Sequence, residues 1–514
     1  MAETGAYVSL DRRLVRGVIA VGVGLVVLRV CALFLDPNSL YADETQYWLW
    51  AQNPDWGYFS KPPLIAWIIA ATTAVFGDAD WAVRLSAPFL HAATAGFLGL
   101  SAAHLFGVRA GALAALLWLT MPAVWLSSTI ISTDAVLMTG WSAGLYALVR
   151  LRDGADWRFA LLLGAAAGWA FLAKYAAIYF VLGTGLAAVV DAPARRALIS
   201  RQGLLASLIF LGLISGNLLW NAANEFATVS HTAANANWGA SLFNPGELIT
   251  FVVDQFGVFG PITFAALIAV IIGAFTGLTA DFSAARPRLM LALYTAPALI
   301  IVSAQAFISR AHANWAASAY AAGTILVAWW FLQGGRWRRI ALIASLGLHS
   351  AAGLLLMALA ASTPLSDAMG LANAFKRVRE WPASVEAVSQ AAQEAGVAAI
   401  AFDDRNDFHQ MQRYGPDDGP ALYMWMRYGA PHNFAEATWP LPSGFTEPVL
   451  IVSERPQEVA LIRDDFVEIA PAGEIVIPLG GGRERRYTLF LAQGYEPVER
   501  TAAFEARVRA MRSE

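Results

Sequence analysis

The chain has 514 residues, of which 57% are hydrophobic and 14% charged, and its mean hydropathy is +0.51. This composition predicts a polytopic helical membrane protein rather than a soluble one. The net charge of -3 gives no indication of a nucleic-acid partner, and the single cysteine, Cys31, excludes an intramolecular disulfide.

A membrane-spanning helix needs about 20 mainly apolar residues, or about 17 at the short end. Eleven stretches meet this requirement: 14–35, 81–106, 108–127, 134–151, 157–173, 175–191, 202–221, 248–277, 288–308, 314–332 and 339–361. The expected fold class is therefore an all-α polytopic membrane bundle of eleven helices within residues 1–361. The first stretch lacks an A-x-A cleavage pattern, so we expect it to stay as an anchor.

Positive charges in the short loops predict the orientation of this bundle, because they collect on the cytoplasmic side. With the N-terminus in the cytoplasm, fifteen arginines fall on the inner side and only four cations on the outer side. The four outer cations are Lys61, Arg84, Lys174 and Arg310. Three polar segments then share the outer face: 36–80, 127–134 and 308–315.

The tail, residues 362–514, is polar and acidic, and we expect it on the outer face as a separate domain. A helix near 383–395 and strand-like runs at 397–402, 447–453, FVEIA and RYTLFLA predict a small soluble α/β domain with a mixed sheet. Three glycines at 480–482 lie between two of these runs and predict a turn, because a phosphate-binding loop would need a helix after it.

The first outer loop, 36–80, carries the densest polar cluster. Its segment 41–64 reads YADETQYWLWAQNPDWGYFSKPPL and contains Asp43, Glu44 and Lys61. Acidic residues beside a span tend to face a water-filled cavity or a substrate; a solvated loop with interfacial aromatics is the alternative. The apolar run 64–76 is too short to cross a bilayer, so this run and residues 43–53 predict two helices lying at the interface.

Asp134 is a second acidic candidate, because it opens the fourth predicted span on the same face as Asp43. N-capping of that helix by Asp134 is the alternative. The four outer cations are candidates for an anionic ligand such as a phosphate, since charge-assisted hydrogen bonds are about twice as strong as neutral ones. Snorkelling of each side chain to the interface is the alternative for all four.

A polar and aromatic cluster, His312, Asn314 and Trp315, occupies another outer loop. No second histidine stands at metal-ligand spacing, so no metal site is expected. The candidates for substrate binding are Lys61, Arg84, Lys174, Tyr175, Arg310, His312, Asn314 and Tyr58.

Six motifs of the chain together resemble one known family. They are YADETQYWLWA, WGYFSKPPLIAW, FGDADWAVRLSA, ISTDAVLM, GWAFLAKYAA and SRAHANWAASAY, in this order. The set is similar to that of GT-C glycosyltransferases of the protein O-mannosyltransferase and lipid A aminoarabinose transferase superfamily. The resemblance covers residues 10–360, whereas the tail matches only in its placement.

The resemblance implies a bacterial inner-membrane enzyme that moves a sugar from a polyprenyl-phosphate carrier to a lipid, glycan or protein acceptor. Transfer would occur at the periplasmic face with inversion of the anomeric centre. Asp43 would be the general base, Glu44 would orient the acceptor or the loop, Asp134 would be the second acidic position, and Lys61 would contact the carrier phosphate. No cofactor is implied, and a divalent cation is left open.

The chemistry of the residues agrees with these roles. A carboxylate within about 3 Å of an acceptor hydroxyl can remove its proton, and a cation can stabilise the phosphate that departs. One interval differs from the family: the 17 residues from Glu44 to Lys61 are fewer than in some aminoarabinose transferases, so an aminoarabinose donor is not assumed.

Two other functions are compatible with the sequence. One is a transporter or flippase of polyprenyl-linked glycans, which the absence of repeated halves disfavours. The other is a polymerase or ligase that uses diphosphate-linked donors.

Overall fold

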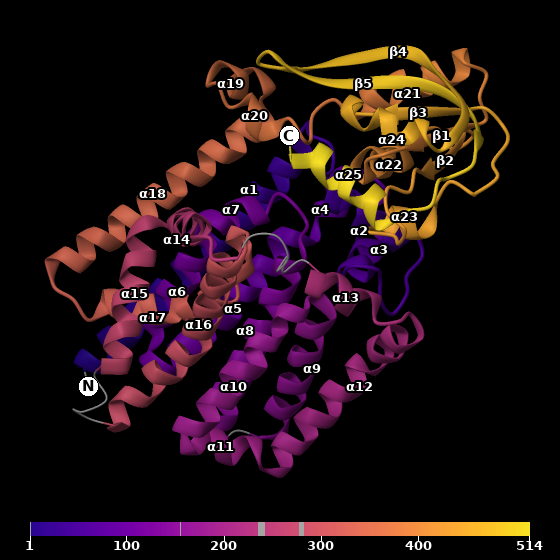
Figure 1. Cartoon of the computed structure of the whole chain (residues 1–514). Coiled ribbons are helices and arrows are strands. Elements are labelled where there is room, and N and C mark those ends of the chain that lie inside the picture. Colours follow the sequence, from indigo (N-terminus) through magenta and orange to yellow (C-terminus); the bar gives the residue numbers. More distant parts are fainter. Residues whose placement is uncertain (1, 155, 235–241, 277–281, 514) are drawn as a thin grey trace. The chain divides into compact units, whose positions relative to one another are not determined.

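The computed structural model describes residues 2–154, 156–234, 242–276 and 282–513. The chain divides into two compact units (Figure 1). The first unit comprises Met1–Leu35 and Pro54–Ala358, and the second comprises Asp36–Asn53 and Leu359–Glu514.

The first unit is built from helices joined by mostly short connections. Its elements are α1 (Ala2–Leu35), α3 (Leu64–Phe76), α4 (Asp80–Arg84), α5 (Ser86–Phe106), α6 (Val108–Thr120), α7 (Pro122–Ser127), α8 (Thr133–Arg152), α9 (Trp157–Ala173), η1 (Tyr175–Ala177), α10 (Ile178–Val190), α11 (Ala192–Leu198), α12 (Arg201–Ala223), α13 (Ala227–Ala234), α14 (Pro245–Phe259), α15 (Pro261–Thr276), α16 (Phe282–Ile308), η3 (Ala313–Ala316), α17 (Ala319–Leu332) and α18 (Arg336–Ala361). Small residues allow close packing: a Cβ added to Gly111 of α6 would lie 2.5 Å from the carbonyl oxygen of Gly99 in α5.

Apolar helices occur throughout this unit, as the composition predicts. Among the described residues, five helices are long and apolar enough to cross a membrane: Asp11–Leu35, Asp80–Phe106, Arg201–Ala223, Arg286–Ile308 and Arg336–Ala361. Shorter apolar helices lie at Leu64–Phe76, Val108–Thr120, Trp157–Ala173, Tyr175–Val190 and Ala319–Leu332. The number of spans, eleven in the sequence analysis, therefore stays a prediction.

Two predicted spans are interrupted. The span 248–277, whose last residue lies outside the described ranges, is divided at Gly260 into α14 and α15, which are bent by 110°. The span 108–127 is divided between α6 and α7 at Pro122, because proline has no backbone N–H to continue a helix. Both interruptions were missed because hydropathy is insensitive to a single glycine or proline.

The second unit contains a five-stranded sheet covered by helices. Its elements are α2 (Ala42–Gln52), α19 (Thr363–Ala368), α20 (Ala372–Phe375), α21 (Trp381–Glu394), β1 (Ala399–Phe402), α22 (Arg405–Tyr414), β2 (Ala421–Met424), α23 (Phe434–Thr438), β3 (Val449–Ser453), η4 (Pro456–Glu458), α24 (Val459–Arg463), β4 (Phe466–Gly480), β5 (Arg483–Tyr495) and α25 (Ala502–Ser513). The strand order is β2-β1-β3-β5-β4. Strands β2, β1 and β3 are parallel, while β5 is antiparallel to β3 and β4, so the mixed sheet predicted from the sequence is confirmed.

Both faces of this sheet are buried, because successive residues of a strand point to opposite sides. On one face, Ile400 and Phe402 of β1 pack with residues of α21 and α22. On the other face, Ala399 and Ala401 pack with residues of α24 and α25. The result is a three-layer α/β arrangement, which the sequence predicted only as a small α/β domain.

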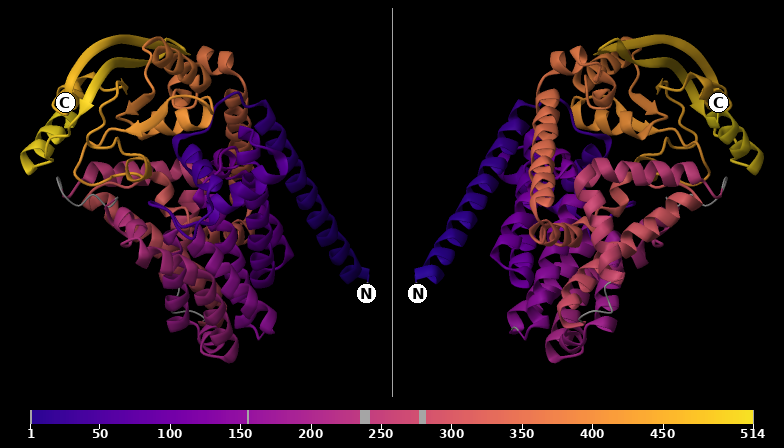
Figure 2. Two further views of the ribbon diagram at one scale, coloured as in Figure 1. Left: turned by 90° about the vertical axis from the view of Figure 1, so that its right-hand side faces the viewer. Right: turned by 90° about the vertical axis from the view of Figure 1, so that its left-hand side faces the viewer.

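The glycines at 480–482 form the turn of the β4–β5 hairpin, as the sequence predicts, and the two strands curve together in Figure 2. Gly480 pairs with Arg483, which leaves a two-residue loop, and both loop glycines have positive φ. Glycine adopts this backbone without strain. The short strand β2 was not predicted.

The boundary between the units differs from the one at residue 361 that we expected. Residues 36–53, including α2 and the acidic pair Asp43 and Glu44, cluster with the C-terminal unit. The sequence alone predicts that the whole loop 36–80 belongs to the membrane part, because the order of segments along the chain does not show which distant segment a helix packs against.

Candidate functional site

In the first unit, the structure brings three of the predicted site residues together. Asp134 Oδ1 lies 2.7 Å from Lys174 Nζ, and Asp134 Oδ2 accepts a hydrogen bond of 2.8 Å from Asn314 Nδ2. The two charged side chains are 18% and 20% exposed. The three residues come from the start of α8, the junction of α9 and η1, and η3, so the site joins segments that are far apart in the sequence.

The helix start explains how Asp134 reaches its partners. Ser132 caps α8, its Oγ accepting from the N–H of Ala135 at 3.4 Å. The alternative that Asp134 itself is the N-cap is therefore wrong. Because the serine satisfies the helix end, the carboxylate of Asp134 is available for Lys174 and Asn314.

Tyr175 continues this polar network toward the loop at residues 54–61. Its hydroxyl donates to Asn217 Oδ1 at 2.8 Å and accepts from Asn221 Nδ2 at 2.9 Å. Asn217 in turn donates to the carbonyl of Trp56 at 2.7 Å. Asn217 and Asn221 were missed in the sequence, although two amides four residues apart in an apolar span are a usable signal, since they share one helix face.

The loop at residues 54–61 is held against α12 and α13. Asp55 Oδ2 accepts from Trp220 Nε1 at 2.7 Å, and the carbonyl of Tyr58 accepts from Thr228 Oγ1 at 2.6 Å. A Cβ on Gly57 would collide with the ring of Trp220, so this approach requires glycine. The loop is thus fitted closely to the helices that carry Asn217 and Asn221.

Tyr58 and Lys61 lie within this fitted loop. The N–H of Tyr58 donates to the carbonyl of Lys61 at 3.1 Å, and the Tyr58 hydroxyl accepts from the N–H of Asp55 at 3.0 Å. Burial raises the pKa of Tyr58 to about 12, so its hydroxyl stays neutral. Lys61 is half-buried and stands directly before Pro62, Pro63 and α3.

The other predicted residues of this unit, Arg84, Arg310 and His312, differ in how far they are buried. Arg84 is buried at the end of α4. Arg310 and His312 are exposed, and the His312 ring packs edge-on against Trp315 with centroids 5.3 Å apart. The role of these three residues in substrate binding stays a prediction.

The acidic pair lies on α2 of the second unit. Glu44 is buried, and its Oε2 accepts from the N–H of Tyr41 at 2.9 Å, which stabilises the helix start. Asp43 has a side chain that is 65% exposed, with Oδ1 3.7 Å from Arg405 Nη2. The two neighbouring carboxylates therefore have different surroundings: Glu44 is enclosed and Asp43 is open to a ligand.

Across residues 2–154, 156–234, 242–276 and 282–513, no three His, Cys, Asp or Glu side chains come together so that they could hold a metal ion.

The family model described as dolichyl-phosphate-mannose-protein mannosyltransferase matches residues 60–220. The lipid A galacturonosyltransferase RgtD of Rhizobium johnstonii is 32% identical over 435 residues, which is 84% of this chain and 89% of that protein.

Two solved structures share the fold. ArnT from Cupriavidus metallidurans bound to undecaprenyl phosphate has a TM-score of 0.64 at 16% identity, covering 95% of this chain and 98% of that one. The same protein in the apo state has a TM-score of 0.63 at 16% identity, covering 98% and 99%. The likeness extends over both units, so the tail of this chain shares the fold of the ArnT structures as well as its place in the sequence. The chain therefore belongs to the GT-C family of membrane glycosyltransferases that use lipid-linked sugar donors, as its motifs predicted.

Proposed function

We propose that this glycosyltransferase transfers a hexuronic acid from a polyprenyl-phosphate carrier to a lipid A-type glycolipid. The observation that carries the proposal is the 32% identity to a lipid A galacturonosyltransferase over 84% of the chain. Among the lipid, glycan and protein acceptors that the sequence allows, it favours a glycolipid, and it suggests galacturonic acid as the first sugar to test.

Asp43 is the proposed general base. Its exposed carboxylate removes the proton of the acceptor hydroxyl while the hydroxyl oxygen attacks the anomeric carbon. The bond from that carbon to the phosphate oxygen breaks, and the electron pair leaves with the polyprenyl phosphate. A single displacement of this kind inverts the anomeric centre. Glu44, which is buried and bonded to the backbone of Tyr41, holds the start of α2.

Lys61 is the proposed contact of the carrier phosphate. A cation there stabilises the negative charge that develops on the leaving group. Support comes from its place at the end of the loop that Trp220 and Thr228 fix. Lys174 is already neutralised by Asp134, so the Asp134 cluster is assigned to positioning, and Arg84, Arg310 and His312 to the donor sugar or the acceptor.

The proposed topology follows the charge bias. Eleven spans with the N-terminus in the cytoplasm place Lys61, Asp134 and Lys174 on the periplasmic face of the bacterial inner membrane, together with the C-terminal unit.

Product analysis with purified enzyme tests the proposal. The detergent-solubilised protein is incubated with polyprenyl-phosphate galacturonic acid and lipid A. Galacturonosylated lipid A with inverted configuration and free polyprenyl monophosphate are expected. A lipid-linked sugar that remains intact while an active relative consumes it in parallel would contradict the donor assignment. Release of polyprenyl diphosphate from a diphosphate-linked donor alone would identify the polymerase or ligase class instead.

A further inference from the structure

The helix that carries Asp43 is packed within the C-terminal unit, mainly against α22. Two backbone groups just before α2 are fixed there: the N–H of Leu40 donates to the Tyr414 hydroxyl at 2.9 Å, and the Leu40 carbonyl accepts from Gln410 Nε2 at 2.9 Å. The N–H of Ser39 donates to the carbonyl of Val378 at 2.8 Å. These bonds fix the point at which the chain enters α2.

Aromatic contacts fix the body of α2. The guanidinium of Arg413 lies over the ring of Trp48, 4.4 Å from its centroid, and Trp50 packs edge-on against Phe434 with centroids 5.7 Å apart. Both tryptophans are buried. An arginine over a tryptophan face is a favourable cation–π arrangement, so α22 and α23 together restrain the rotation of α2 about its axis.

One side chain of α22 reaches the acidic residue itself. The Nη2 of Arg405 lies 3.7 Å from Asp43 Oδ1, and its Nη1 donates to Gln46 Oε1 at 3.4 Å. Asp43 and Gln46 are three residues apart and therefore lie on the same face of α2. The fork of a single guanidinium contacts both of them, which restricts the directions that the carboxylate can take.

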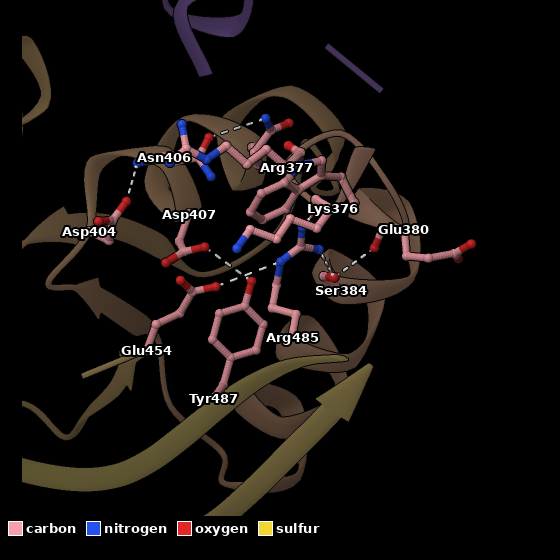
Figure 3. A network of polar contacts seen from close by, with 12 residues as sticks. Lys376, Arg377, Glu380, Ser384, Asp404, Asn406, Asp407, Glu454, Arg485 and Tyr487 are labelled. Atoms are coloured by element: carbon pink, nitrogen blue, oxygen red, sulfur yellow. Dashed lines mark hydrogen bonds and ion pairs between the residues drawn. The ribbon is translucent and has the colours of Figure 1, made fainter. Parts of the chain in front are cut away.

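Arg405 is itself fixed, because α22 starts from a rigid corner at the carboxyl end of β1. Asp404 caps the helix by accepting from the N–H of Asn406 at 2.8 Å, and it also pairs with Arg455. On the opposite side of α22, Asp407 is buried and accepts from the Tyr487 hydroxyl at 3.1 Å. Figure 3 shows Asp407 from α22 and Glu454 from the end of β3 directed toward Tyr487 and Arg485.

Arg485 connects this corner to α21. Arg485 lies 3.7 Å from Glu454 Oε1 and donates to Ser384 Oγ at 2.7 Å (Figure 3). Side chains from the end of β3, from β5 and from α21 thus meet next to α22. Arg405 is the first residue of α22, and its neighbours Asp404 and Asp407 are both held by hydrogen bonds or ion pairs.

We propose that Arg405 is a positioning residue for the base, and that the C-terminal unit acts as the scaffold that orients helix α2 for catalysis. This inference rests on the proposed function, in which Asp43 removes the acceptor proton. The ion pair is exposed, at 65% for Asp43 and 40% for Arg405, so Arg405 acts on the direction of the carboxylate rather than on the stability of the fold.

Steady-state kinetics of Arg405 variants test the proposal. Arg405→Ala is expected to lower kcat by roughly 10- to 100-fold, since a small misplacement of a catalytic group has an effect of this size, and to leave KM for the donor unchanged. Arg405→Lys, which keeps the charge, is expected to restore a large part of kcat. Arg486→Ala is the matched control: this exposed arginine of the same unit pairs with Glu474 and Glu484 of the β4–β5 hairpin.

The possible outcomes separate the inference from the proposed function. If Asp43→Asn is inactive while Arg405→Ala keeps the wild-type kcat, the positioning role is wrong and the base assignment stands. If Asp43→Asn keeps its turnover, the base assignment is wrong and the positioning role falls with it. If Arg405→Ala and Arg486→Ala lower kcat equally, the effect comes from the domain in general, and the specific role of Arg405 is wrong.

Discussion

Lys174 Nζ and Asp134 Oδ1 are 2.7 Å apart, and the second oxygen of Asp134 is bonded to Asn314. The carboxylate is therefore satisfied on both sides by the protein, and the ammonium is neutralised before any substrate arrives. A phosphate that approached Lys174 would compete with Asp134. The proposed contact of the carrier phosphate is therefore Lys61, whose loop is fixed by Trp220 and Thr228.

The first prediction concerns the coupling between these two residues. Because both side chains are largely enclosed, a double-mutant cycle with Asp134→Asn and Lys174→Met should give a coupling energy of about 1 kcal/mol in unfolding stability. Thermal unfolding of the purified protein in detergent measures it. The exposed pair Arg109 and Asp11, 3.4 Å apart, is the control and should show almost no coupling. Additive effects at Asp134 and Lys174 would refute the pair.

The second prediction concerns the fit of the loop that carries Lys61. A Cβ at Gly57 would meet the ring of Trp220, and a Cβ at Gly216 would meet the ring of Trp56. Gly57→Ala and Gly216→Ala should each destabilise the protein by about 1–3 kcal/mol through overpacking, and should raise KM for the polyprenyl-phosphate donor.

Gly212 provides the matched control for this pair of substitutions. It lies one turn earlier on the same helix, α12, and a Cβ there has no neighbour within 4 Å. Gly212→Ala should leave both the unfolding temperature and KM near the wild-type values. Equal effects of all three alanines would show that helix glycines, and not the loop contact, determine the result.

The third prediction concerns the pH dependence of the C-terminal unit. Burial raises the pKa of Asp407 well above its usual value, and the nearby carboxylate of Glu454 adds to the rise. The folded state therefore holds this proton more tightly than the unfolded chain. Protonated Asp407 therefore stabilises the fold fully at a pH below the pKa that this carboxyl has in the unfolded chain. The stabilisation is lost as the pH rises through the pKa that it has in the folded protein. Asp407→Asn, which cannot ionise, should be more stable than the wild type at neutral pH, and the difference should vanish in acid.

Hydrogen exchange of the full-length protein measures this difference in stability in the segments around Asp407. Peptides from β1 and α22 are compared between wild type and Asp407→Asn at about pH 7.5, where the variant should exchange more slowly, and at about pH 4, where the two proteins should exchange alike. Asp417→Asn, an exposed carboxyl of the same unit, is the control. Slower exchange in Asp407→Asn at acidic pH only would contradict the prediction.

Much of the fold follows from the sequence, because hydropathy and alternation are local properties. The interfacial candidates at 43–53 and 64–76 are the helices α2 and α3, although their depth in a membrane stays a prediction. The helix, the four strand-like runs and the glycine turn of the tail are found near the expected residues. The 110° bend at Gly260 was missed, because the apolar pattern continues through it.

The residues of the candidate site could be predicted in part, because polarity beside an apolar helix is also a local property. Asp134, Lys174 and Asn314 were each singled out by polarity beside an apolar helix, but their mutual contacts depend on three distant segments. Ser132 as the cap of α8 followed from local rules and was overlooked. Arg405 could not be predicted as a positioning residue. Its contact with Gln46 joins α22 to a helix more than 350 residues earlier, and nothing in the local sequence shows that these two helices pack together.

The most direct test of the account is the turnover of Asp43→Asn on a polyprenyl-phosphate sugar donor. The purified variant is compared with the wild type and with Asp78→Asn, an exposed carboxyl of the segment 36–80 that also contains Asp43. Release of polyprenyl phosphate and formation of glycosylated acceptor are the paired readouts. We predict that Asp43→Asn lowers kcat by at least about 100-fold, the lower end of general-base contributions, while Asp78→Asn stays active. A folded Asp43→Asn protein that keeps most of its turnover would contradict the central claim that Asp43 removes the acceptor proton.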